Sequence, residues 1–185
     1  MSAGRLISSI SKLLADAPLY PQRDPEAMRF LVQRCAEIHL EHIRSNGDPF
    51  EYGRARPLDF GHWSAHKLEL LSGFRISHGE AVAVGVLLDS IYAEKKGWIT
   101  AAELGLIREG FARSGFPLWF PEFETRDASG ERAVFGGLRD FQEHLGGELT
   151  VTFPRGIGAR HEVHEIDLAI MEQAIEELRT LSLAR

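Results

Sequence analysis

The distribution of hydrophobic and polar residues along the chain predicts a mainly helical protein. In most segments the apolar residues recur at three- and four-residue spacing, which is the periodicity of an amphipathic helix. Within residues 78–97 small and apolar residues dominate instead, which is typical of a helix buried in the core. The complete set of predicted helices is 6–17, 25–45, 61–72, 78–97, 100–115, 131–146 and 167–184.

Local signals mark where several of these helices begin. Asp24, Ser77 and Asp167 each stand directly before a predicted helix, where their side chains can accept hydrogen bonds from free N–H groups. Thr100 and Glu103 form a capping-box pattern at another helix start. Each signal predicts that a helix begins at the residue that follows it.

One segment has the alternating, β-branched pattern of a strand. This is GELTVTF, residues 147–153, and residues 156–166 are a possible partner strand. Strands and helices do not alternate along the chain, so no nucleotide-binding sheet is predicted. The predicted fold class is mainly α, a helical bundle with a small β-ribbon, in a single domain over residues 1–185.

Composition and charge narrow the possible partners and compartment. The chain has 185 residues and a net charge of −6, without a strongly basic segment, so we expect no nucleic-acid partner. A single cysteine, Cys35, excludes an intramolecular disulfide and fits a reducing compartment; we expect it to be a small buried residue of its helix. No 18-residue apolar run occurs, so we expect a cytoplasmic protein that does not span a membrane.

Three histidines lie within seventeen positions in the middle of the chain. His62 and His66 are four residues apart, so on a helix their rings leave the same face, and His78 opens the next predicted helix. Imidazole is a frequent zinc ligand and titrates near neutral pH. The spacing is not that of the zinc metalloproteases, which need a glutamate where this chain has Trp63. The residues alone leave open whether these histidines form a metal site or hydrogen-bonded structural positions.

The segments that carry these histidines also resemble a known family. DFGHWSAH, followed by HGEAVAVG, resembles the signature of 3-dehydroquinate synthase and its relatives, the sugar-phosphate cyclases. The family pattern is Asn, then Phe or Leu, then GHxxGHAxE, and later HGExVAxG. The family spacing of sixteen residues is reproduced between His62 and His78. The resemblance covers nearly the whole chain and implies the family's C-terminal helical domain, without the N-terminal NAD-binding half.

The resemblance implies roles for the histidines. His62 and His78 would be two ligands of zinc or another divalent metal, and a glutamate from the NAD-binding half would be the third. His66 would be the catalytic residue on the substrate side, where it contacts the substrate phosphate or a proton in transit.

The resemblance also implies substrate-binding positions, at which the chain departs from the family. Asp59 stands where dehydroquinate synthases have an asparagine, and His39 stands where they have a lysine. Arg56 neighbours Ala55, the position of an expected arginine. A lysine-bearing turn expected near residues 138–147 is also not evident. An extra negative charge and fewer cations disfavour a carboxylate-bearing substrate.

We therefore predict the metal- and substrate-binding half of a divergent sugar-phosphate cyclase. In the family, NAD transiently oxidises a ring alcohol, phosphate is eliminated, the carbonyl is reduced and an intramolecular aldol step closes the ring. The chain would be a carbon–oxygen lyase only when completed by an NAD-binding half on the same or another chain, and inactive alone. A homodimer is expected. The alternative function is a non-catalytic helical module for metal binding, ligand binding or dimerisation.

Overall fold

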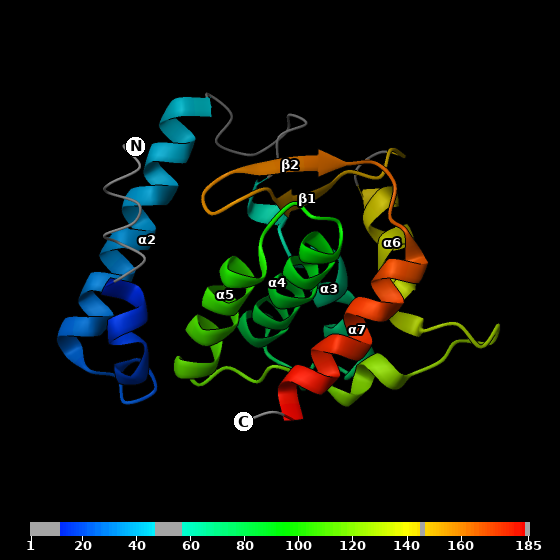
Figure 1. The fold of residues 1–185 in the computed structure, drawn as a ribbon, viewed down its shortest axis with the longest axis horizontal. Helices are drawn as coiled ribbons and strands as arrows, with labels where there is room; N and C mark the ends of the chain where they lie inside the picture. Colours follow the sequence, from blue (N-terminus) through cyan, green and yellow to red (C-terminus); the bar gives the residue numbers. More distant parts are fainter. Residues whose placement is uncertain (1–11, 47–56, 145–146, 184–185) are drawn as a thin grey trace.

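Helix α4 lies at the centre of the fold, and three helices pack against it (Figure 1). The computed structural model describes residues 12–46, 57–144 and 147–183. Helix α3 packs on α4 along most of its length, α7 and α5 contact other sides of α4, and α6 packs on α3. The α-helices span α2 (Pro25–Asn46), α3 (His62–Leu71), α4 (His78–Lys95), α5 (Ala101–Arg113), α6 (Gly136–His144) and α7 (Leu168–Leu183).

The connections between the helices contain short 3-10 turns and one β-hairpin. Strands β1 (Val151–Pro154) and β2 (Arg160–Val163) are antiparallel, with Val151 opposite Val163. The hairpin lies over one end of the helices (Figure 1), and β1 packs on α4. The predicted mainly helical fold with a small β-ribbon is therefore confirmed. The 3-10 turns are η1 (Ala17–Leu19), η2 (Pro57–Asp59), η3 (Pro121–Glu124) and η4 (Ala133–Phe135).

The predicted helix starts are confirmed by side-chain hydrogen bonds. The Asp24 carboxylate accepts bonds from two backbone N–H groups in the first turn of α2, and Asp167 does the same for α7. Thr100 and Glu103 form the predicted capping box at α5. Ser77 forms a second capping box at α4 with Glu80. The first residue of α4, which is His78, is thus held in place by the local sequence.

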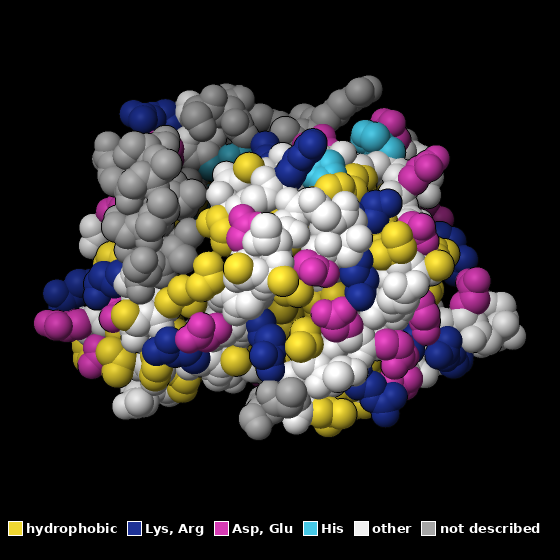
Figure 2. Space-filling view, in the orientation of Figure 1, with side chains coloured by type: hydrophobic (Ala, Val, Ile, Leu, Met, Phe, Trp, Pro, Cys, Tyr) yellow, Lys and Arg dark blue, Asp and Glu magenta, His cyan; other side chains and the backbone are white. Residues whose placement is uncertain are grey.

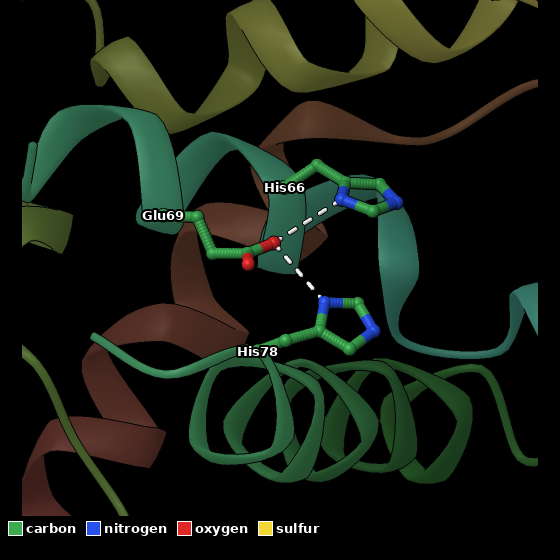
Figure 3. A group of neighbouring side chains, drawn as sticks. All are labelled: His66, Glu69 and His78. Carbon is green, nitrogen blue, oxygen red and sulfur yellow. Dashed lines mark hydrogen bonds and ion pairs between the residues drawn. The ribbon is translucent and has the colours of Figure 1, made fainter. Parts of the chain in front are cut away.

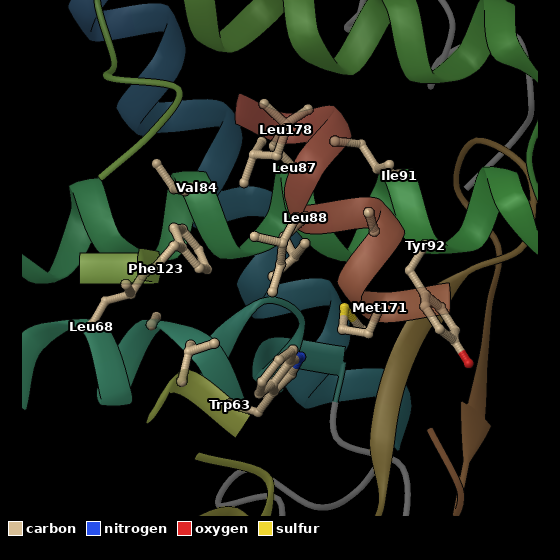
Figure 4. Packing of buried hydrophobic residues seen from close by; sticks show 14 of the residues in the cluster. Trp63, Leu68, Val84, Leu87, Leu88, Ile91, Tyr92, Phe123, Met171 and Leu178 are labelled. Carbon is tan, nitrogen blue, oxygen red and sulfur yellow. The ribbon is translucent and has the colours of Figure 1, made fainter. Parts of the chain in front are cut away.

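The hydrophobic core forms where α3, α4 and α7 meet (Figure 4). This core includes the buried side chains of Trp63 and Leu68 from α3, Leu88 from α4 and Met171 from α7. Burial of such side chains stabilises the fold by roughly 1.5–3 kcal/mol each. The buried residues of helix α4 extend from Ala81 to Ala93, and its N-terminal residue, His78, lies just outside this buried segment.

Helix α2 lies at the edge of the fold, on the side of α5 (Figure 1). An apolar groove of about 640 Å³ lies between them, lined among others by Met28 of α2 and Leu106 of α5. Cys35 of α2 is exposed, so the prediction of a buried cysteine is wrong. The periodicity correctly predicted the helix. It could not show that only part of the helix surface meets the rest of the protein.

The surface of the described residues carries charges of both signs. On the face seen in Figure 2, Lys and Arg side chains are interspersed with Asp and Glu, and they form no broad basic area. Within the described ranges, no helix combines the length and the apolar character that crossing a bilayer requires.

Candidate metal centre

The turn before α3 is shaped by a close approach to α4. Gly61 is the N-cap of α3 and has a left-handed backbone conformation, with φ of 78°. A Cβ atom at Gly61 would lie 2.5 Å from the backbone nitrogen of Val86, and one at Gly85 would lie 2.1 Å from the carbonyl oxygen of Gly61. Only glycine fits at both positions. The pair lets the two helices approach closely, with His62 as the first residue of α3.

The three histidine rings come together at the N-terminal ends of α3 and α4. The ring centroids of His62 and His78 are 5.3 Å apart, and the His66 centroid lies 5.6 Å from each of the other two. His66 follows His62 by one helical turn, and the adjacent start of α4 supplies His78. The sequence-predicted cluster therefore exists as a nearly equilateral triangle of imidazoles.

Each of the three rings has its Nδ1 atom at a protein oxygen. The Nδ1 of His62 lies 3.1 Å from the carbonyl oxygen of Phe60. The Nδ1 atoms of His66 and His78 each lie 3.2 Å from Oε2 of Glu69 (Figure 3). Metal-ligating histidines usually donate one ring N–H to a carbonyl or carboxylate and keep the other nitrogen for the metal. The arrangement fits a divalent metal in this respect.

The pKa of His62 is lowered from its ordinary value. Burial of the half-exposed ring is the main cause, because it disfavours the charged form, and the neighbouring rings of His66 and His78 act in the same direction. The Phe60 carbonyl and Asp59 act in the opposite direction. His62 is thus favoured in its neutral form, which is the form that binds metals.

A buried carboxylate fixes the backbone on both sides of His62. Asp89 of α4 is fully buried and accepts hydrogen bonds from the Gly61 N–H, at 3.1 Å, and from the Trp63 indole, at 2.8 Å. Burial raises the pKa of Asp89 to about 7, although both hydrogen bonds favour the charged form. Asp89 therefore connects the centre of α4 to the turn that presents His62.

A cavity of about 540 Å³ adjoins the histidine cluster and includes two of the predicted site residues, Asp59 and His66. Lys67 lines the same cavity, and its ammonium group lies 2.9 Å from a carboxylate oxygen of Asp140. Three carboxylates and one lysine therefore line the cavity. Its residues are Asp59, Trp63, His66, Lys67, Glu69, Leu70, Phe74, Gly137, Asp140 and Phe141.

Of the other two predicted substrate-binding residues, His39 is not brought to this cluster. His39 is exposed on α2, and the contacts between described residues join it to none of the three rings. Arg56 lies outside the described residues. Both assignments stay predictions.

Glu69 is a residue of the cluster that was not predicted from the sequence. Its carboxylate contacts two of the three histidines, and a ligand atom of Glu69 lies within 4.8 Å of ligand atoms of His66 and His78. A signal was available, because the final glutamate of the family pattern GHxxGHAxE falls at Glu69.

Comparison with known proteins identifies the family. Residues 6–131 match the family described as 3-dehydroquinate synthase C-terminal, which is more than half of the chain. The chain belongs to this family. The match includes all three histidines, Asp59 and Glu69, and so agrees with the resemblance drawn from DFGHWSAH and HGEAVAVG.

Individual relatives include two kinds of synthase in this family. A 3-dehydroquinate synthase of Aliivibrio fischeri strain MJ11 is 27% identical over 157 residues, which are 84% of this chain and 41% of the relative. A 2-epi-5-epi-valiolone synthase of an Actinomyces species is 29% identical over 153 residues, 83% of this chain and 38% of the relative. The chain thus spans about two fifths of the length of these curated relatives.

A solved structure of the family has the same fold. ValA, a 2-epi-5-epi-valiolone synthase from Streptomyces hygroscopicus subsp. jinggangensis, superposes with a TM-score of 0.80 at 26% identity, over 94% of this chain and 47% of ValA. That structure was determined with NAD⁺ and Zn²⁺ bound. The chain therefore corresponds to the C-terminal helical part of a family in which a solved member binds both ligands.

Proposed function

We propose that this chain is the metal- and substrate-binding half of a divergent sugar-phosphate cyclase. The observation that supports this most directly is the imidazole triangle at the starts of α3 and α4, with centroid spacings of 5.3–5.6 Å, in a chain that belongs to the family. Two imidazoles on one tetrahedral zinc, with zinc–nitrogen distances of about 2.0–2.1 Å, have centroids roughly 5 Å apart, close to the 5.3 Å between the rings of His62 and His78. The spacing is therefore suited to a shared cation.

His62 and His78 are the proposed metal-holding residues. Zinc is the first choice, because imidazole suits it and because the related ValA structure contains Zn²⁺. Such an ion would act as a Lewis acid toward oxygen atoms of the substrate. The third protein ligand is proposed to be a glutamate of an NAD-binding half, as the family resemblance implies.

The residues beside the metal pair are proposed to bind and orient the substrate. His66 lines the cavity with a side chain that is 59% exposed, so it can hold or transfer a proton at a substrate oxygen. Asp59 lines the same cavity and can accept hydrogen bonds from substrate hydroxyl groups. His39 and Arg56 are proposed as further substrate contacts on the family resemblance alone.

The charge of the cavity favours a substrate without a carboxylate. Three acidic residues, Asp59, Glu69 and Asp140, line the cavity, and its one lysine, Lys67, is already paired with Asp140. A substrate carboxylate would add a negative charge beside these groups and would be repelled. We therefore propose a sugar phosphate that lacks a carboxylate, with NAD bound by the other half of the enzyme and a homodimer as the assembly.

Metal binding by the purified chain tests the proposal. We expect zinc and cobalt to bind with a stoichiometry of one, and His62→Ala or His78→Ala to weaken binding at least tenfold in a competition titration. His164→Ala is the matched control, because His164 is similarly exposed and has its Nδ1 at a carbonyl oxygen, that of Leu149. Absence of metal both from the chain alone and from the chain joined to an NAD-binding half would overturn the metal assignment, as would an equal loss of binding in the control variant, because the chain alone lacks the proposed third ligand.

A further inference from the structure

One carboxylate oxygen contacts two of the three imidazoles. Oε2 of Glu69 lies 3.2 Å from Nδ1 of His66, on the same helix, and 3.2 Å from Nδ1 of His78, on the next helix. Figure 3 shows both rings turned with Nδ1 toward Glu69 and with the second nitrogen on the far side. A single side chain therefore sets the orientation of one residue from α3 and one from α4.

This contact also fixes where the rings carry their hydrogens. An ionised carboxylate oxygen can only accept hydrogen bonds, so both Nδ1 atoms must be the donors. The lone pair of each neutral ring is then on Nε2. His62 follows the same rule, because its Nδ1 donates to the Phe60 carbonyl oxygen. All three rings thus have Nε2 available to a ligand.

The position of Glu69 suits this role. Its side chain is only 16% exposed, whereas the side chains of His66 and His78 are 59% and 54% exposed. Such exposed rings have little packing to hold them in one rotamer. The largely buried carboxylate between them supplies the missing restraint, and it links the proposed metal-holding ring of His78 to the proposed substrate-side ring of His66.

We propose that Glu69 is a positioning residue that locks His66 and His78 in the Nδ1–H tautomer and directs both Nε2 atoms to the open side of the cluster. The part of this inference that concerns the metal rests on the proposed function. The part that concerns the tautomers does not.

The competing assignment is that Glu69 itself binds the metal, together with both Nδ1 atoms. One ring nitrogen each of His66 and His78 and one oxygen of Glu69 lie within 4.8 Å of one another, close enough to share an ion. That arrangement leaves His62 without a role, although its ring centroid lies as near to the other two rings as they lie to each other. The common anchoring of all three Nδ1 atoms favours the positioning role.

Histidine nitrogen NMR of the metal-free chain tests the tautomers directly. In the wild type, we expect His66 and His78 to be Nδ1–H tautomers. Glu69→Ala removes the acceptor for both, and we expect both rings to lose this preference. Glu69→Gln keeps the shape and one acceptor oxygen, which can accept from both rings as Oε2 does, so it is expected to preserve both tautomers. Wild-type rings in the Nε2–H tautomer, or tautomers unchanged in Glu69→Ala, would overturn the inference.

Metal affinity provides the second measurement. Loss of a carboxylate that orients ligating histidines typically weakens metal binding 10- to 100-fold, and we expect a loss in this range for Glu69→Ala. The matched control is Glu122→Gln, because Glu122 is also largely buried and is paired with Arg75 rather than with a histidine. In this variant the tautomers of His66 and His78 and the metal affinity should equal those of the wild type.

The outcomes separate this inference from the proposed function. If His66 and His78 are Nδ1–H tautomers in the wild type but no metal binds, either to the chain alone or to the chain joined to an NAD-binding half, the proposed metal site is refuted and the positioning role of Glu69 stands. Complete loss of binding in Glu69→Gln, with binding unchanged in His62→Ala, would show that Glu69 is a ligand and would overturn the positioning role.

Discussion

The indole N–H of Trp63 donates a hydrogen bond of 2.8 Å to the carboxylate of Asp89, and both side chains are buried in the core. The same carboxylate accepts from the N–H of Gly61. His62, a proposed metal ligand, lies between these two donors in the sequence. Its position therefore depends on Asp89, a polar residue inside the helical core. A buried carboxylate without a cationic partner is costly, and this cost makes the stability of the protein depend on pH.

We predict that Asp89→Asn changes the pH dependence of stability. Burial raises the pKa of Asp89 from 3.8 to about 7, so the folded state binds more protons than the unfolded state between these values. The free energy of unfolding therefore falls as pH rises from about 4 to about 7, by about 4 kcal/mol from this group, and is constant above pH 7. Asparagine cannot ionise, so the variant lacks this decrease.

Urea unfolding at a series of pH values measures the effect. Asparagine keeps one acceptor oxygen for the two donors, so Asp89→Asn loses one hydrogen bond at every pH. Relative to wild type it should be least stable near pH 4, should improve as pH rises to about 7, and should change no further above that. Glu109→Gln, at an exposed residue paired with Arg113, should give a curve parallel to wild type. If the stability of Asp89→Asn followed a curve parallel to that of the wild type, the Asp89 carboxyl group would not be the source of the pH dependence.

The close approach of α3 and α4 predicts opposite effects for two glycine substitutions. Gly85→Ala places a Cβ 2.1 Å from the Gly61 carbonyl oxygen, so we expect a loss of about 2–3 kcal/mol or more from the resulting strain. Gly105 is also inside a helix, but a Cβ there meets nothing within 4 Å. Gly105→Ala should therefore stabilise the protein by about 0.5–1 kcal/mol. Thermal or urea unfolding would contradict this account if both variants changed in the same direction.

Much of the fold could be predicted because its signals are local. Helix periodicity and the caps at Asp24, Ser77, Thr100 and Asp167 depend on residues within one turn of each other, and the structure has helices that begin at these positions. The exposure of Cys35 could not be predicted in this way. Burial depends on how much of the α2 surface other elements cover, and the sequence of α2 alone contains no such information.

The histidine cluster was predictable only as a set of spacings. That His62 and His66 share a helix face follows from their separation, but the contact of His78 with both requires the crossing of α3 and α4 at Gly61 and Gly85. The roles of Glu69 and Asp89 depend on the same crossing. A carboxylate that acts across a helix pair leaves no periodic pattern, which is why reasoning from the residues missed Asp89. The only available signal for Glu69 was the last position of the family pattern.

We predict that Arg132→Met strongly destabilises the protein. The Arg132 side chain is 1% exposed and is paired with Glu124, Glu172 and Glu176. These ion pairs connect the segment between η3 and η4 with helix α7. Its removal leaves three carboxylates close together without their shared cation, so we expect a loss of about 3 kcal/mol. Arg179→Met is the control, because the Arg179 side chain is 52% exposed and contacts the same Glu124; it should cost less than about 1 kcal/mol. If urea unfolding gave equal losses of stability for Arg132→Met and Arg179→Met, the buried arginine would have no special role.

We predict that the chain alone has no cyclase activity and that an NAD-binding half restores it. The described residues contain one two-stranded sheet and no nucleotide-binding sheet, and the curated relatives are more than twice as long as the matched segment. Without bound NAD the ring alcohol cannot be oxidised, so phosphate elimination has no activated substrate. The measurement is phosphate release from a panel of sugar phosphates, with zinc and NAD, by the chain alone and by the chain joined to the N-terminal half of a relative. Turnover should appear only in the joined protein, should be lost in His62→Ala, and should persist in His164→Ala.

Turnover by the chain alone would contradict the prediction that both halves are needed for activity. An inactive joined protein that still binds zinc and NAD would favour the alternative, a non-catalytic binding module.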